Sequence, residues 1–228
     1  MPLLALLSPA MWLLAAAAVP PERTASNPAA DSNELPAHVF ELLEQKRYRE
    51  ALAEIEPLAV RRNQHATFAL ANFYLCGKVV EFSCAKAEAL FTASLTSRNG
   101  LPANPEVTRA ARNEIAWVHA ACTEPGFSPS LDIAKRFSLE ALRESFGTPA
   151  LPYAYDTVAA VVARTQDYAQ AARLQRVAIA RLKDLARTET VETYTFAEFD
   201  KRLALYERGE PATVDASTAA QNCNALPD

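Results

Sequence analysis

The sequence predicts an all-α protein built from helix hairpins. Half of the 228 residues are apolar, only five are glycine, and alanine is abundant. This composition suits closely packed helices, whereas a sheet needs more turn residues and β-branched runs. Apolar residues also recur three and four positions apart along most of the chain, which is the spacing of one helix face. Since such a helix does not bury its apolar face alone, we expect neighbouring helices to pack in pairs.

The first two predicted hairpins lie before residue 96. Their helices are expected at residues 37–45, 50–60, 64–75 and 84–95. The pair Arg47-Tyr48 marks the turn of the first hairpin, and Gly77 follows the first helix of the second, as is typical of a helix C-terminus. The helical pattern then breaks at Asn99-Gly100 and Pro102, which predicts a loop between the second and third hairpins.

Two further hairpins and a final helix complete the prediction. Their helices are expected at residues 107–122, 131–142, 152–164 and 168–186, with a capping helix at 196–207. Apolar residues occupy one face in each range; in the first of them Ala111, Ile115 and Val118 recur at helical spacing. The sequence therefore predicts one helical repeat domain over residues 37–211, of about four hairpins plus a capping helix, and a C-terminal tail over 212–228.

The N-terminal segment predicts export from the cytoplasm. Residues 2–19 are nearly all apolar, and the small residues Ala15–Ala18 suit a signal peptidase, so residues 1–18 are interpreted as a signal peptide. Residues 19–36, rich in Pro, Ala, Ser and Asn, predict a disordered linker. The expected location is the periplasm or the extracellular space.

An uncleaved membrane anchor is the alternative for the same segment. No Lys or Arg precedes Arg23, so the basic start of a signal peptide is missing. The apolar run, interrupted by Ser8 and Pro9, falls slightly short of the roughly 20 residues that cross a bilayer. An anchored protein would face the periplasm from the inner membrane, and Arg173, Arg176 and Lys183 could then contact anionic surfaces. Membrane contact is expected only in that case.

Four cysteines, all beyond the apolar segment, fit an oxidising compartment. Three pairings are possible, and we favour Cys76 with Cys84 and Cys122 with Cys223, the second of which would tether the C-terminal tail. Four buried thiols are the alternative. No metal site is expected, because the cysteines lack C-x-x-C spacing and the three histidines are dispersed.

Several stretches resemble helical repeat families. Asp167-Tyr168, Ala171 and Ala178, after Tyr155 and Val158, are similar to a tetratricopeptide repeat, in which small residues allow close helix packing. The hairpin over residues 68–94 resembles the longer repeat of the suppressor-enhancer-of-lin type, with its longer turn flanked by Cys76 and Cys84. The resemblance covers roughly residues 37–211 and implies a right-handed stack of antiparallel hairpins, as in bacterial exported repeat proteins.

The resemblance also implies a binding groove for a protein or peptide, lined by the first helix of each hairpin. Carried over by position, the groove residues would be Phe68, Asn72, Asn113, Trp117, Tyr153, Asp156 and Arg164. Asn amides hydrogen-bond an extended peptide, Trp provides an apolar anchor and Arg receives a carboxylate. Each of these residues has an alternative role in the core or on the solvated surface.

Other classes of function have little support in the sequence. A net charge of −4 argues against a nucleic-acid partner, which needs an excess of Lys and Arg. The nucleophile elbow, the P-loop, the dinucleotide glycine fingerprint and the zinc-protease motif are all missing, so neither catalysis nor a cofactor is expected. His119 and Glu114 share a helix, but five residues apart they do not align as an acid and base pair. We therefore expect a non-catalytic scaffold module, with a component of an envelope assembly as the alternative.

Overall fold

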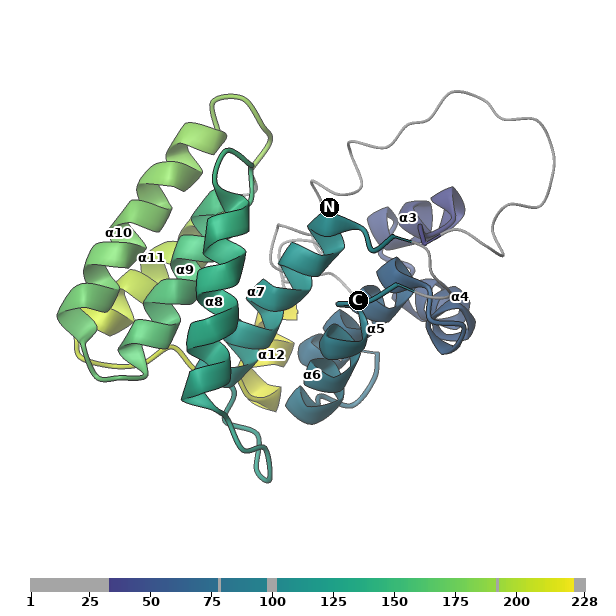
Figure 1. The fold of residues 1–228 in the computed structure, drawn as a ribbon, viewed down its shortest axis with the longest axis horizontal. Helices are drawn as coiled ribbons and strands as arrows, with labels where there is room; N and C mark the ends of the chain where they lie inside the picture. The colour runs from purple at the N-terminus through teal and green to yellow at the C-terminus, as the bar shows by residue number, and fades with distance from the viewer. Residues whose placement is uncertain (1–32, 78, 98–101, 192, 224–228) are drawn as a thin grey trace. The chain divides into compact units, whose positions relative to one another are not determined.

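The computed structural model describes residues 33–77, 79–97, 102–191 and 193–223, and within them it is all-helical (Figure 1). The ten helices of this part are α3 Ala37–Glu44, α4 Tyr48–Val60, α5 Gln64–Cys76, α6 Cys84–Ala93, α7 Pro105–Ala121, α8 Leu131–Ser145, α9 Leu151–Ala163, α10 Tyr168–Leu185, α11 Thr193–Glu207 and α12 Ala216–Cys223. No strand occurs among these residues, where the only β-type pairing is an isolated bridge between Cys122 and Val214. The predicted all-α class is confirmed.

All nine predicted helices are present, and no end differs from the predicted one by more than three residues; α8, for example, ends at Ser145 rather than residue 142. The helix α12 was not predicted and lies in the segment expected to be a tail. The predicted signal peptide lies outside the described residues, as does most of the predicted linker. No helix in the described part of the chain combines the length and apolarity needed to cross a bilayer.

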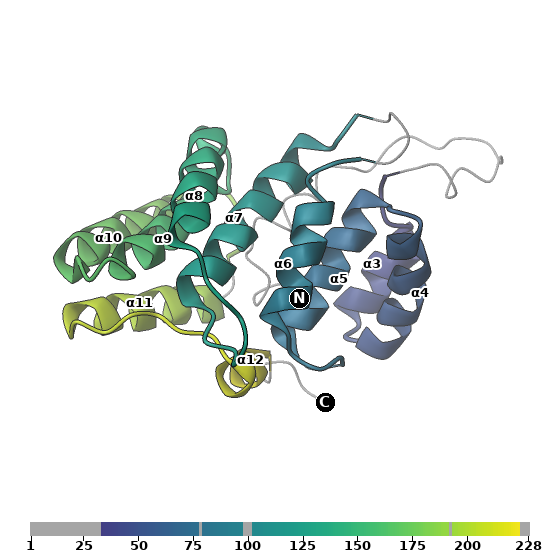
Figure 2. The ribbon, with the colours of Figure 1, turned by 60° about the horizontal axis from the view of Figure 1, so that its bottom comes forward.

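The chain divides into two compact units, and the division falls within α7. Among the described residues, the first unit runs to Ala111 and also includes residues 219–223, whereas the second covers Arg112–Thr218. In each unit the most extensive packing joins helices that are consecutive in the chain: α3 with α4, α4 with α5 and α5 with α6 in the first, and α8 with α9, α9 with α10 and α10 with α11 in the second. This serial packing is visible within each unit in Figure 2.

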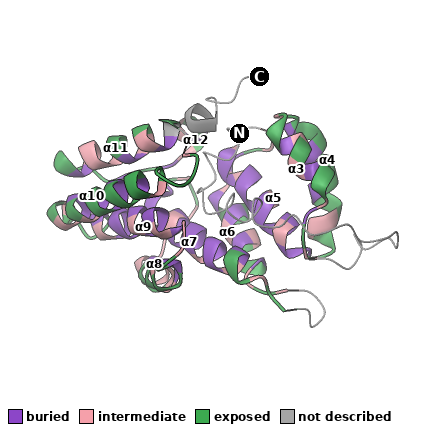
Figure 3. Ribbon diagram, turned by 90° about the horizontal axis from the view of Figure 1, so that it is seen from above, coloured by how far each residue is buried: buried purple, intermediate pink, exposed green. Residues whose placement is uncertain are grey.

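The core of the first unit forms between α3, α4 and α5. It includes Val39, Leu43, Tyr48, Ile55 and Phe73, which are all buried. The helix α5 is buried along most of its length, as its colour in Figure 3 shows. Such a helix is central to its unit, because a surface helix keeps a polar face toward solvent.

Hydrogen bonds at the start of α5 fix its position in the first unit. The Asn63 side chain accepts from the Ala66 amide and caps the helix. The buried amide of Gln64 donates to the Ser94 carbonyl at 2.8 Å and accepts from the Asn104 amide at 2.8 Å. Gln64 therefore connects α5 to the end of α6 and to the segment before α7. The backbone carbonyl of Asn33 accepts from His65, so the residues before α3 also contact this helix end.

The core of the second unit forms around α9, which is buried on nearly all sides. Pro152 has no backbone N–H, which costs nothing near the start of α9, because the first N–H groups of a helix have no intrahelical acceptor. Small residues such as Ala159 and Ala163 let α10 approach closely. The helices α8 and α10 each begin at a capping side chain, Ser130 and Asp167 respectively. Because α9 lies between its neighbours, polar side chains that it carries must find partners inside the unit.

Candidate functional site around Arg202

Arg202 of α11 lies among charged and aromatic side chains in the second unit. Its Nε donates to Asp156 Oδ1 at 2.7 Å, and its Nη1 lies 3.5 Å from Glu198 Oε2. Its guanidinium carbon lies 5.3 Å from the ring centre of Trp117 and 5.1 Å from that of Phe199, within the range of cation–π attraction. These five residues are called the Arg202 cluster below.

Helical spacing explains how three helices supply the cluster. Glu198 and Arg202 are four residues apart and share a face of α11, where Phe199 is their neighbour. Asp156 projects from the buried helix α9, and Trp117 comes from the last turns of α7. Side chains far apart in the sequence therefore meet because α9 and α11 both pack inside one unit.

Gln175 of α10 completes the partners of Asp156. Its Nε2 donates to Asp156 Oδ1 at 2.7 Å and to the backbone carbonyl of Phe199 at 3.2 Å. Both partners are acceptors, so they fix which end of the amide carries the nitrogen. The side chains of Asp156, Arg202 and Glu198 are only 9%, 14% and 16% exposed. The ion pairs of this cluster are therefore shielded from solvent far more than ordinary surface pairs.

Burial and charge act in opposite directions on Arg202. Burial by itself lowers the pKa of the guanidinium, but the Asp156 carboxylate, its hydrogen bond and the nearby Tyr206 and Glu198 together raise that pKa above its ordinary value. Burial raises the pKa of the Tyr153 and Tyr206 phenols, and the negative charge of Asp156 raises it further. At neutral pH the cluster therefore holds a charged guanidinium beside neutral phenols.

Three of the predicted groove residues meet in this region. Trp117 and Asp156 both contact Arg202, and the Tyr153 ring packs edge-on against Phe199 with centres 5.7 Å apart. Trp117 is half-buried and packs against two apolar clusters, whereas Tyr153 and Asp156 are buried.

The other predicted groove residues lie elsewhere. Asn113 is buried one turn before Trp117 on α7, and Arg164 is exposed at the end of α9. Phe68 and Asn72 belong to the first unit, where both are buried. The Phe68 ring lies 5.3 Å from the Phe91 ring, and the Asn72 amide donates to the Phe68 carbonyl at 2.9 Å. The common groove formed by all seven residues stays a prediction.

Arg202, Gln175 and Tyr206 were not predicted as site residues. The spacing of Glu198 and Arg202 was a visible signal, since oppositely charged residues four apart on a helix attract each other. Gln175 carried no such signal, because a glutamine among alanines and arginines is typical of a solvated helix face.

No protein-family model, curated protein or solved structure matches the chain.

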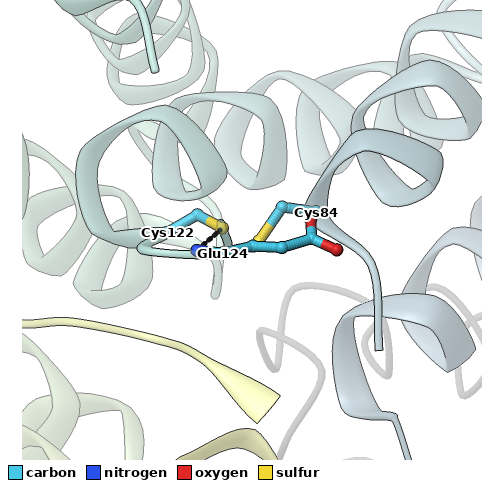
Figure 4. A group of neighbouring side chains, drawn as sticks. All are labelled: Cys84, Cys122 and Glu124. Carbon is cyan, nitrogen blue, oxygen red and sulfur yellow. Dashed lines mark hydrogen bonds between the residues drawn. The ribbon is translucent and has the colours of Figure 1, made fainter. Parts of the chain in front are cut away.

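The three described cysteines, Cys76, Cys84 and Cys122, are each part of a disulfide. Figure 4 draws Cys84 and Cys122 with Glu124, whose backbone amide donates to Cys122 Sγ at 3.3 Å. A disulfide sulfur is not a thiolate, the form in which cysteine ligates a metal ion, so these cysteines do not provide thiolate ligands. The expected disulfide chemistry is supported, whereas the pairing stays a prediction, since Cys223 has no described side chain.

Polar partners occupy several other residues singled out in the sequence. The buried His119 accepts at Nδ1 from the Ser130 amide at 3.1 Å and stacks on Phe127, so it holds the loop before α8. On α10, Arg176 pairs with Glu207 at 2.6 Å and Arg173 donates to Gln170. Of these two contacts, only the pair with Glu207 offsets positive charge on the face considered for an anionic surface, because the Gln170 amide is neutral.

Proposed function

We propose that the chain is a non-catalytic module that binds a protein or peptide partner, and that the Arg202 cluster is part of its binding surface. The observation that carries the proposal is the guanidinium of Arg202, which lies near the rings of Trp117 and Phe199 and donates to Asp156. Trp and Arg are the residue types that contribute most to binding energy in protein interfaces.

Pre-organisation is the physical basis of the proposed binding. Side chains that are already fixed lose little conformational entropy when a partner arrives. Arg202 is fixed by Asp156, Glu198 and two rings, and half-buried Trp117 is supported by apolar packing while retaining some exposed surface. A partner segment that stacks on Trp117 or accepts a hydrogen bond from the guanidinium would therefore meet a surface that needs little rearrangement.

The proposal includes a stack of tetratricopeptide-like hairpins and a location in the cell envelope. Serial packing of consecutive helices in both units supports the stack, since repeat proteins pack each hairpin on its neighbours. Disulfides at the three described cysteines support an oxidising compartment such as the periplasm or the extracellular space.

Panning a random peptide phage library on the immobilised chain tests the proposal. Selected peptides would be synthesised, labelled and titrated with the unaltered chain and with Trp117→Ala. We expect binding to the unaltered chain that weakens at least about tenfold in the variant, since an interface hot spot contributes roughly 2 kcal/mol or more. Val60→Ala is the control, because Val60 is exposed and lies in the first unit.

Since Trp117 also packs in the core, Arg202→Lys provides a second variant that keeps the charge but loses the planar guanidinium. Thermal unfolding by circular dichroism checks that each variant is folded. Peptides that bind both variants as tightly as the unaltered chain, or a library that yields no specific peptide, would contradict the proposal.

A further inference from the structure

One side of α8 exposes large apolar side chains. Leu139 is 55% exposed and Phe146 is 60% exposed, and half-buried Leu142 lies between them in the sequence. Phe146 follows the last residue of α8, and its φ of −61° is still helical, so its side chain continues the face of the helix. A group of exposed apolar side chains on one face is typical of an interaction site.

These three residues form a narrow apolar row, called the α8 seam below. Their spacing of three and four places them on one side of the helix, at positions a, d and a of a heptad. The preceding positions in the same register are the charged residues Asp132 and Lys135. The α8 seam is therefore confined to the C-terminal part of the helix.

The packing of α8 inside its unit uses a different side of the helix. The helix packs most extensively on α9, where Ala134 lies in one cluster with Ala160 and Val161. The buried residues of α8 are small and recur four, three and four positions apart: Ala134, Ser138, Ala141 and Ser145. Because these residues face the interior, the α8 seam keeps its exposed surface.

Basic side chains flank the α8 seam. Arg136 and Arg143 both occupy position e of the same register, and both are exposed. Neither forms an ion pair within the described part of the chain. The acidic residues Glu140 and Glu144 lie on another side of the helix and pair with Arg112 at 3.1 Å and 2.6 Å. The uncompensated charge beside the α8 seam is therefore positive.

We propose that the α8 seam docks an acidic amphipathic helix of a protein partner. Apolar residues of the partner, three and four apart, pack along the seam, and flanking Glu or Asp residues pair with Arg136 and Arg143. A row one residue wide fits a single helix, whereas a helix that lies on a membrane needs a broad apolar face. This inference does not rest on the binding proposed for the Arg202 cluster, with which the α8 seam shares no residue.

Fluorescence anisotropy with a designed peptide tests the proposal. The probe is a labelled peptide of about three heptads with Leu at a and d and Glu at e and g, whose copies repel one another. We expect it to bind the full chain, and to bind at least about tenfold more weakly to a variant that combines Leu139→Ala with Phe146→Ala. Val177→Ala is the control, because Val177 is exposed on another helix of the same unit. A scrambled peptide of the same composition should not bind.

Charge reversal tests the flanking ion pairs. A variant that combines Arg136→Glu with Arg143→Glu should bind the acidic peptide more weakly and prefer a peptide with Lys in place of Glu. Arg49→Glu, at an exposed position in the first unit, is the matched control. Circular dichroism checks that each variant is folded, and if the alanine variant is not, the charge-reversal variant decides.

Three results would overturn the proposal. The first is an acidic peptide that does not bind, or that binds both variants as tightly as the unaltered chain. The second is binding to vesicles that contain phosphatidylglycerol, lost in both variants and without binding of the peptide, which would assign the α8 seam to a membrane surface. The third is self-association in sedimentation experiments that the alanine variant abolishes, which would assign it to a second copy of the chain.

Discussion

Arg202 shows how much of the second unit depends on one side chain. Asp156 is buried on α9, and a buried carboxylate is costly unless a cation and hydrogen bonds compensate its charge. Arg202 supplies the cation, and Gln175 supplies a further hydrogen bond. Loss of either partner should therefore lower the free energy of unfolding, because α9 would pack against its neighbours with an uncompensated charge.

Replacing Arg202 with methionine tests this dependence. Met preserves much of the apolar bulk but leaves Asp156 without its cation, and breaking a buried pair from one side typically costs about 3 kcal/mol or more. We expect a fall of that order in the free energy of unfolding, measured by urea titration. Arg208→Met is the matched control, because its pair with Glu210 is on the surface and should contribute little. Equal effects of the two variants would contradict the role given to Arg202.

His65 makes the stability of the first unit depend on pH. Burial is the largest influence and lowers its pKa, against the opposing effects of the Asn33 carbonyl and the charges of Glu34 and Glu106. Above the ordinary His pKa of about 6.5, His65 is neutral in both the folded and the unfolded states and does not change the free energy of unfolding with pH. Below it, the unfolded chain binds a proton that the folded chain resists, so stability falls as the pH decreases.

Urea midpoints measured between about pH 5 and 8 should therefore decrease toward acid in this histidine range. His65→Gln should flatten that decrease, since Gln retains a donor for the Asn33 carbonyl but does not titrate. His38→Gln, at an exposed position, is the control. A pH profile that His65→Gln leaves unchanged would show that another group is responsible.

At the residue scale, the sequence predicted which helices carry polar side chains but not how these side chains pair. Trp117, Tyr153 and Asp156 were expected on one surface, and the structure gathers them near Arg202 and Phe199. Pairing depends on the rotation and offset of packed helices, which spacing within one helix does not specify. The partner that organises them, Arg202, comes from a helix expected only to cap the array.

At the scale of helices, local signals were sufficient to place nine of the ten. Apolar spacing of three and four gives the interior of each helix, and capping residues such as Ser83, Ser130 and Asp167 give its start. The helix α12 was missed because it is only eight residues long and its apolar positions, such as Ala216 and Ala219, are small residues that are also common in tails. Its start is instead fixed by Asp215, which accepts from the Ser217 and Thr218 amides.

Gly77 and Gly147 both follow helices, but a side chain would be crowded only at Gly77. Gly77, after α5, has φ +68°, and a Cβ placed there would lie 2.7 Å from Phe82 Cβ. Gly147, shortly after α8, has φ +77°, but no atom lies within 4 Å of such a Cβ. Both conformations are left-handed and favour glycine, and only the first is also crowded.

We expect Gly147→Ala to lower the free energy of unfolding by about 1 kcal/mol, the strain of a left-handed alanine. Gly77→Ala should cost roughly 2–4 kcal/mol, because overpacking against Phe82 adds to the same strain. Urea unfolding of the two variants measures the difference directly. If the two costs were the same, the crowding at Gly77 would not matter to stability.

At the scale of the whole molecule, the sequence predicted one repeat domain over 37–211, whereas the structure divides within α7. No Gly, Pro or polar linker marks this division, because it falls inside a continuous helix rather than in a loop. Residues 219–223 group with the first unit, although they follow the second in sequence. Such long-range grouping depends on tertiary contacts, which no local sequence pattern encodes.

Disulfide bonds restrain the chain at the three described cysteines. The three described cysteines are all oxidised, so the folded chain is stabilised in part by covalent restriction of its unfolded state. Reduction under native conditions should lower the free energy of unfolding by about 2–5 kcal/mol, the usual cost of losing a native disulfide in a small exported domain. Urea titration with and without a phosphine reductant measures this change, and a variant with all four cysteines changed to serine should not respond to the reductant. Identical midpoints for the oxidised and reduced chain, together with free thiols in the purified protein, would contradict a structural role for the disulfides and remove the main support for an oxidising compartment.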